Sequence, residues 1–201
     1  RKYSVDPFVI VTIAGVESNY GVHHSQFSVF NALYSQIHEI PRRSKWATRE
    51  LAEFIKYCFK DRLDTQEIGG SYAGAVGYGQ FIPSSFTRYS VDFNENGVRE
   101  PYSWPDVLGS IANYLRMNGY KKNSNNYQRD GDIYKSVYAY NHAHNYVLAV
   151  LELTEKIRER CTGSRKYYPT TITDFDRERV RMYKSKDWAP DKTINMDAWI
   201  E

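Results

Sequence analysis

Cysteine is scarce in this sequence: the 201 residues contain two, Cys58 and Cys161. Two cysteines cannot form the dense disulfide framework of a small secreted scaffold. Cys58 falls on an apolar helical stripe with Leu51 and Phe54, which is typical of a buried thiol, although a disulfide with Cys161 stays open. The cysteine content therefore does not identify the compartment.

Long hydrophobic runs and a strong net charge are also absent. No stretch of about 18 apolar residues occurs, so the sequence predicts no membrane-spanning helix. The net charge of +3, with a pI near 8.7, is too weakly basic to indicate nucleic-acid binding but is compatible with an anionic polymer such as a cell wall. There is no initiator methionine and no signal peptide, so we expect a processed or trimmed piece.

Tyrosine, in contrast, is abundant, with 18 residues. Its ring offers a flat apolar face with a hydroxyl at the edge, which suits sugar rings and wet grooves as well as half-buried core positions. Hydrophobic residues make up 41% of the chain and charged residues 25%, as is usual for a globular protein. The length suffices for one substantial domain and an appendage.

Residues 7–21, PFVIVTIAGVESNYG, form an almost wholly apolar segment with one carboxylate, Glu17. Asp6 can cap a helix here, Pro7 suits the first helical position and Gly21 is a plausible stop. A helix that is apolar on every side is expected in the middle of a domain. Burial and the negative end of the helix dipole would keep Glu17 protonated as a general acid. The alternative is a solvated Glu17 paired with Arg or Lys.

Helical spacing of apolar residues predicts further helices over residues 29–38, 45–60, 107–118 and 145–160, and aromatic and aliphatic residues are crowded in residues 133–141. Ser28 caps the first of these, and Pro41 ends it. The second places Ala47, Leu51, Phe54 and Ile55 inward and Arg49, Glu50, Glu53 and Lys56 toward water. The fold class is therefore mainly α.

Residues 69–85, GGSYAGAVGYGQFIPSS, are rich in glycine and small residues. Such a segment makes turns and lets the backbone approach another group closely. Because Tyr72, Val76, Tyr78, Phe81 and Ile82 are too apolar for a free linker, we expect a structured loop that lines a cleft rather than a flexible surface loop.

Residues 92–106, DFNENGVREPYSWPD, carry oxygen ligands at alternate positions. Asp92, Asn94, Asn96 and the Val98 carbonyl, with Gly97 for the turn, match the first half of an EF-hand loop. The usual twelfth-position Glu is replaced by Ser103, and Asp106 follows three residues later. With two formal charges, a Ca²⁺ (or Na⁺) site would be weak, and an Asx-rich turn without an ion is the alternative.

Two further segments carry less specific signals. His142 and His144 have no neighbouring Cys or Glu, which does not favour a metal site. Residues 161–201 have little helical period and many aromatic and charged residues. We expect a domain over residues 1–160 and an irregular tail over 161–201 that wraps it, with binding to a partner protein as the alternative.

Taken together, the motifs resemble a known family. GVESNYG, PRR, GSYAGAVGYGQFIPSSF, VDFNENG, SIANYL and AYNHAHNY occur in the order and approximate spacing of the B-type membrane-bound lytic murein transglycosylases. The resemblance covers about residues 3–158 and implies a lysozyme-like helical catalytic domain. The glycine-rich motif with GYGQF is its most specific part.

The resemblance also implies roles for individual residues. Glu17 would be the single catalytic acid and base, and the substrate-binding residues would be Arg42, Arg43, Ser71, Tyr78, Gln80, Tyr114, Tyr140, Asn141 and Tyr146. The cation loop would be a lengthened EF-hand, with Asp92, Asn94, Asn96, Val98 and Asp106 as ligands. No cofactor would be required beyond this weak Ca²⁺ or Na⁺ site.

Three features depart from the family pattern. Little helix precedes Glu17, the segment between Tyr120 and Tyr134 is short, and the tail after Cys161 has no counterpart. We therefore expect a more open groove, with the preferred substrate length most affected.

By resemblance, the reaction is cleavage of the MurNAc–GlcNAc β-1,4 bond with formation of 1,6-anhydroMurNAc and no consumption of water. Glu17 would protonate the bridging oxygen and then deprotonate the muramyl 6-hydroxyl. Asn141 or the Tyr140 hydroxyl could donate to Glu17. The alternatives are a lysozyme-type muramidase and a non-catalytic peptidoglycan-binding module. The expected partner is peptidoglycan rather than nucleic acid, the expected location is the periplasm or cell envelope, or outside the cell, and the expected state is a monomer.

Overall fold

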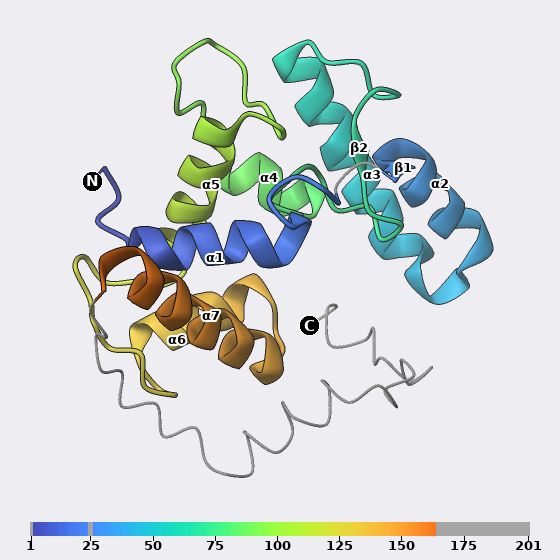
Figure 1. Ribbon diagram of the computed structural model, residues 1–201. Helices are drawn as coiled ribbons and strands as arrows, with labels where there is room; N and C mark the ends of the chain where they lie inside the picture. Colours follow the sequence, from blue (N-terminus) through green and yellow to red (C-terminus); the bar gives the residue numbers. More distant parts are fainter. Residues whose placement is uncertain (1, 24–25, 164–201) are drawn as a thin grey trace. The chain divides into compact units, whose positions relative to one another are not determined.

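The computed structural model describes residues 2–23 and 26–163, and seven α-helices and one small sheet lie in this part of the chain (Figure 1). The elements are α1 (Pro7–Ser18), β1 (Phe27–Ser28), α2 (Val29–Glu39), α3 (Pro41–Asp61), β2 (Gly69–Gly70), α4 (Pro83–Tyr89), α5 (Trp104–Met117), α6 (Asp132–Tyr140) and α7 (His144–Thr162). The mainly α prediction is confirmed. The predicted tail lies outside the described residues, apart from the last turn of α7.

The chain divides into two compact units, and the divisions fall within α1 and α5. One unit spans Ile13–Tyr114, and the other combines the residues up to Thr12 with those from Leu115 onward. The boundary expected after residue 160 stays a prediction. None of the described helices is both long and apolar enough to cross a membrane.

Helix α1 begins as the sequence predicts. The Asp6 carboxylate accepts a hydrogen bond from the Phe8 backbone N–H at 3.0 Å, and Pro7 is the first helical residue. The expected burial on every side is wrong, because Val16 is 41% exposed while Val9 and Ile13 are fully buried. The helix therefore has one core-facing side although its composition is apolar all round.

Helices α2 and α3 pack against each other within the 13–114 unit (Figure 1). The Ser28 hydroxyl caps α2 by accepting from the Asn31 N–H at 3.3 Å, as expected. Helix α3 begins at Pro41 and not near Lys45, since a proline at the first helical position needs no amide partner. Cys58 is buried on α3, and both Cys58 and Cys161 are free thiols.

Two positions of α3 contradict the sequence pattern. Ile55 was expected inward but is 43% exposed, and Glu50 was expected in water but is 6% exposed. The Glu50 carboxylate accepts from the Ser84 backbone N–H (2.9 Å) and from the Ser84 hydroxyl (3.0 Å) at the start of α4. The first backbone N–H groups of a helix have no partner within the helix, and they stabilise a negative charge. A buried carboxylate is therefore tolerated here. Helix α4, which the sequence analysis missed, is thereby fixed to α3.

The other unit is organised around a buried ionic cluster. The Asp6 carboxylate forms an ion pair with Arg158 of α7 and accepts from the Tyr127 hydroxyl. Thr154 donates to Thr12 at 3.0 Å, and the Arg158 guanidinium lies 4.5 Å from the Phe8 ring centroid. These contacts join the N-terminal half of α1 to α7.

Candidate functional site

Glu17 lies near the C-terminal end of α1 and is half-buried. The chain then makes a left-handed turn, in which Asn19, Tyr20 and Gly21 have φ angles of 48°, 53° and 86°. The Ser18 hydroxyl closes this turn by donating to the Ala14 carbonyl at 3.1 Å and accepting from the Gly21 N–H at 3.1 Å. The carboxylate thus precedes a tight turn held by hydrogen bonds.

Tyr78, a predicted substrate-binding residue, brings the glycine-rich loop to this turn. A Cβ atom added at Gly21 would lie 3.1 Å from the Tyr78 ring and 3.3 Å from Trp104. Tyr78 stacks on Trp104, with centroids 4.7 Å apart, and contacts Tyr102 edge-on at 5.4 Å. The structure therefore places an aromatic cluster against the turn that follows Glu17. Sequence analysis missed Tyr102 and Trp104, although both lie in the segment it assigned to the cation loop.

The glycine-rich loop is structured. Strand β2 pairs antiparallel with β1, and Gly77, with φ of 63°, has no room for a side chain because a Cβ would lie 2.3 Å from the Pro101 carbonyl oxygen. Gln80 also has a positive φ, 49°, and its side-chain amide donates to the Gly77 carbonyl at 2.7 Å. The Ser71 hydroxyl accepts from the Ala75 N–H at 3.2 Å. Both predicted residues thus have side chains that support loop turns.

Arg42 and Arg43 lie in the first turn of α3 in different environments. Arg42 is exposed, whereas Arg43 is 7% exposed and its guanidinium lies 4.4 Å from the Trp46 ring centroid. Burial lowers the pKa of Arg43, and the neighbouring Tyr72 opposes this shift. The role of both residues in a substrate groove stays a prediction.

Tyr114 is 8% exposed and belongs to an aromatic cluster. Its ring centroid lies 4.6 Å from that of Tyr89 and 5.8 Å from that of Phe81, and burial raises the pKa of the phenol to about 12. The ring therefore has a packing role, and its expected part in sugar binding stays a prediction.

Three predicted site residues belong to the unit that contains α6 and α7. Tyr140 ends α6, Asn141 follows it, and Tyr146 lies in the first turn of α7; all three are half-buried. The Asn141 backbone donates to the Val137 carbonyl at 3.3 Å, and its carbonyl accepts from the Ala143 N–H at 2.7 Å. Their expected contribution to sugar subsites stays a prediction.

The 92–106 loop is folded around its own oxygen atoms. The two Asp92 carboxylate oxygens accept from the backbone N–H groups of Asn96 (3.0 Å) and Gly97 (2.7 Å), and the Asn94 side-chain oxygen accepts from Asn96 N–H at 3.1 Å. Asp106, 2% exposed, accepts from three backbone N–H groups, those of Phe93, Asn94 and Glu100. The Asp92 and Asn94 side chains thus accept backbone N–H groups within the loop, while Asn94 and Asn96 are solvent-exposed, and their role as cation ligands stays a prediction.

The donor chemistry of this loop fits a hard cation. Carboxylate and amide oxygens keep a second lone pair after accepting one hydrogen bond, and these are the ligands that Ca²⁺ takes. Glu100, which accepts from the Asn96 side-chain amide at 2.7 Å, adds a third carboxylate that the sequence analysis did not consider. Residues 2–23 and 26–163 contain no cluster of three or more His, Cys, Asp or Glu side chains that could hold a metal ion. Asp92, Glu100 and Asp106 therefore do not form such a cluster, and a cation here would depend on amide and backbone oxygens as well.

A buried ion pair fixes the loop to α3. Arg99 pairs with Asp61, and its backbone N–H also donates to the Asp61 carboxylate at 3.0 Å. The Tyr57 hydroxyl donates to the Arg99 carbonyl at 2.9 Å. Sequence analysis missed this anchor, because residues 38 positions apart carry no periodic signal.

The two histidines are part of an aromatic group. Tyr138 stacks on His144 with centroids 4.8 Å apart and contacts His142 edge-on at 5.3 Å. Nδ1 of His144 lies 2.8 Å from the Tyr134 hydroxyl. These contacts give both rings a packing role.

Comparison with known proteins identifies similar sequences. Residues 1–129 match a family model described as "Transglycosylase SLT domain". The chain is 38% identical over 122 residues to the membrane-bound lytic murein transglycosylase B of Escherichia coli. This match covers 61% of the chain and 34% of that protein, so the chain spans about a third of the length of this curated relative.

Solved structures with the same fold include two lytic transglycosylases. The Escherichia coli enzyme Slt35, solved in complex with calcium, matches with a TM-score of 0.71 and 27% identity, over 79% of this chain and 68% of that one. SltB1 of Pseudomonas aeruginosa, a soluble lytic transglycosylase, matches with a TM-score of 0.72 and 26% identity, over 81% and 73% of the two chains. The expected lysozyme-like fold is confirmed by this likeness.

Proposed function

Because the chain belongs to the Transglycosylase SLT domain family, we propose that it is a peptidoglycan lytic transglycosylase, a lyase that cleaves the MurNAc–GlcNAc β-1,4 bond and forms 1,6-anhydroMurNAc. The observation that carries the proposal is the placement of Glu17 before a turn against which Tyr78 of the glycine-rich loop packs. A carboxyl group on the helix turn that leads into a loop packed by aromatic rings suits acid catalysis on a sugar.

In the proposed reaction, Glu17 acts twice. Its carboxyl proton passes to the bridging oxygen as the glycosidic bond breaks, with the acetamido group of the sugar assisting at the anomeric carbon. The resulting carboxylate then takes the proton of the muramyl 6-hydroxyl as that oxygen bonds to the anomeric carbon. Glu17 ends protonated, and no water is consumed. One carboxylate is sufficient, whereas most glycoside hydrolases need two.

Replacing Glu17 with Gln tests the assignment. The amide keeps the shape of the side chain but cannot give up and regain a proton, so release of muropeptides from purified peptidoglycan should fall at least about a thousandfold. Mass spectrometry of the products of the unaltered protein should show muropeptides that are one water lighter than muramidase products.

A matched control is Glu67→Gln, which changes an exposed carboxylate in the turn before β2 and should leave activity unchanged. Circular dichroism should show the same helical content in all three proteins. Residual cleavage by the Glu17→Gln protein would remove Glu17 from the mechanism, and products with reducing ends would replace the transglycosylase by a muramidase. Binding without release would indicate a non-catalytic module.

The 92–106 loop is included in the proposal as a weak Ca²⁺ site. Asp92, Asn94, Asn96, the Val98 carbonyl and Asp106 would supply its ligands, and the ion would stiffen the loop that carries Tyr102 and Trp104 to Tyr78. The ion is assigned a structural role and no part in the chemistry.

The remaining parts of the proposal concern context. Peptidoglycan is the proposed partner, and the periplasm or cell envelope is the proposed location, since the Escherichia coli relative is named a membrane-bound murein transglycosylase. The monomeric state stays a prediction.

A further inference from the structure

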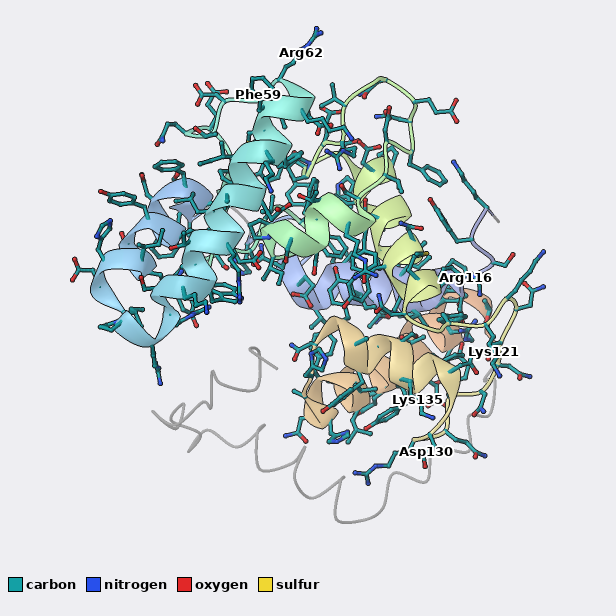
Figure 2. The ribbon with its side chains drawn as sticks, turned by 180° about the vertical axis from the view of Figure 1, so that it is seen from behind. Phe59, Arg62, Arg116, Lys121, Asp130 and Lys135 are labelled. Atoms are coloured by element: carbon teal, nitrogen blue, oxygen red, sulfur yellow. The ribbon has the colours of Figure 1, made fainter. Side chains whose placement is uncertain are left out.

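A small cavity of about 180 Å³ opens on the unit that contains α6 and α7. Its lining comes from the segment before α6, from α6 itself and from the first residue of α7, and consists of Arg129, Asp130, Tyr134, Lys135, Tyr138 and His144. Figure 2 shows Asp130 on the segment before α6 and Lys135 on the helix. The volume is below the roughly 300–1,000 Å³ of sites for drug-sized ligands, so the cavity suits a small head group.

Three charged side chains line this cavity without pairing with one another. Arg129, Asp130 and Lys135 are all exposed. In the part of the chain that the structure describes, their charged groups take part in no ion pair and no hydrogen bond. The cavity therefore presents two cations and one carboxylate to a ligand.

The remaining polar group of the lining is the His144 ring, which two tyrosines orient. Its Nδ1 lies 2.8 Å from the Tyr134 hydroxyl, and the Tyr138 ring stacks on the imidazole with centroids 4.8 Å apart. Tyr134 is 5% exposed, so this side of the imidazole is fixed to the core. Because the phenol occupies Nδ1, Nε2 is the ring nitrogen left for a ligand. The half-buried Tyr138 ring adds an apolar wall.

We propose that this cavity binds a zwitterionic amino-acid end, in which one carbon carries both a free ammonium and a free carboxylate. The carboxylate pairs with Arg129 and Lys135, and its oxygens match the N–H groups of a guanidinium. The ammonium pairs with Asp130, and the carbon chain lies against Tyr138. A simple anion would meet the charge of Asp130, and a simple cation would meet two positive charges. A ligand with both signs therefore pairs every charge of the lining.

The proposed function supplies a ligand of this class, and the inference rests on that function only for this choice. A stem peptide of peptidoglycan contains a diamino acid. Where this residue is diaminopimelate and is not cross-linked, its side chain ends in an ammonium and a carboxylate on one carbon, whereas a lysine side chain ends in an ammonium alone. The lining therefore favours the diaminopimelate peptide. Free amino acids are the second source of the same chemistry.

The test is a titration of the Glu17→Gln protein, followed through the imidazole carbon-bound proton signals of His144. The probes are D-alanine, N-acetyl-D-alanine, which keeps only the carboxylate, and D-alaninamide, which keeps only the ammonium. Since the ion pairs are exposed, D-alanine should give a saturable shift with a dissociation constant on the order of 1 mM. The two singly charged probes should bind at least about threefold more weakly.

Substitutions in the lining have opposite expected effects on these probes. Lys135→Gln should weaken D-alanine binding about three- to fivefold. Asp130→Asn should also weaken D-alanine but should strengthen N-acetyl-D-alanine, because it removes the negative charge that repels a carboxylate. The matched control is Lys121→Gln, which changes an exposed lysine of the same unit outside the lining (Figure 2) and should leave all constants unchanged.

Stem peptides that contain either diaminopimelate or lysine then identify the source of the ligand. A preference for the diaminopimelate peptide that is lost in Lys135→Gln assigns the stem, whereas equal binding of the two peptides assigns free amino acids. Absence of a saturable His144 shift with D-alanine, or equal effects of Lys135→Gln and Lys121→Gln, would overturn the proposal. Because binding is measured and not turnover, a failure of the proposed lytic activity would leave these results unchanged.

Discussion

Gln80 occupies a left-handed backbone conformation, with φ of 49°, that residues other than glycine seldom adopt. Its side chain compensates in part, because Nε2 donates to the Gly77 carbonyl of the same turn at 2.7 Å. Two different functions could reside at this position: the backbone shape of the turn and the amide group that the resemblance assigns to the substrate. A pair of substitutions separates them.

Gln80→Ala keeps the unfavourable φ and removes the side-chain hydrogen bond, so the free energy of unfolding should fall by about 1 kcal/mol. Gln80→Gly removes the same bond but also the backbone strain, worth about 1–2 kcal/mol, and should be at least as stable as the alanine variant. Urea unfolding and muropeptide release are the measurements. If the amide group contacts substrate, both variants should lose activity to a similar extent; recovery of activity in the glycine variant would assign the role to the backbone.

The 92–106 loop shows how far an element can depend on its own short-range hydrogen bonds. Asp92 and Asp106 together accept hydrogen bonds from five backbone N–H groups. These side-chain acceptors take the place of the carbonyl acceptors that a helix or sheet would supply to the backbone. Arg99 and Asp61 then hold the preformed loop against α3.

Thermal unfolding in CaCl₂ tests the proposed site. With a dissociation constant near 1 mM, as a low charge count suggests, 10 mM Ca²⁺ should stabilise the protein by about 1.4 kcal/mol, or a few degrees in Tm. Asp92→Asn should abolish most of this calcium-dependent shift while MgCl₂ gives little in either protein. An equal shift in the variant, or none in the unaltered protein, would reject the site.

Local signals predicted most elements, and long-range contacts account for the misses. The helix caps at Asp6 and Ser28 could be predicted from the sequence because each side chain accepts from a backbone N–H only two or three residues away. The burial of Glu50 was not, because its partner Ser84 lies 34 positions further on. Glu17 and Tyr78 were selected through their motifs and stay predictions, whereas the stacking of Tyr78 on Trp104 joins residues 26 positions apart and carries no local signal.

At the scale of the whole molecule, the two thiols report on opening of the structure. Cys58 is fully buried in the 13–114 unit, and Cys161 is exposed on α7. Burial, with a smaller contribution from Asp61 and Asp64, raises the pKa of the Cys58 thiol to about 12. An unfolded chain would ionise the same thiol near pH 8.5.

The unfolded state therefore binds fewer protons than the folded state above pH 8.5, and stability should fall as pH rises. Between pH about 8.5 and 9.5, where most tyrosines of the unfolded chain are still protonated, the slope contributed by Cys58 should disappear in Cys58→Ala and persist in Cys161→Ser. Urea unfolding at several pH values measures it, and thiol labelling of the native protein should modify Cys161 rapidly and Cys58 only on opening. Identical slopes in all three proteins would contradict this account.

The unit that combines the residues up to Thr12 with those from Leu115 onward also sets an order of events during synthesis. Asp6 leaves the ribosome 152 residues before its ion-pair partner Arg158, which at about 5–20 residues per second is roughly 8–30 seconds. Once Tyr114 has been synthesised the 13–114 segment is complete, whereas the N-terminal half of α1 has none of its α7 contacts until synthesis reaches Arg158. A nascent chain therefore carries Glu17, the proposed catalytic residue, on a helix whose N-terminal half is not yet anchored, and that half is anchored only when α7 has been translated.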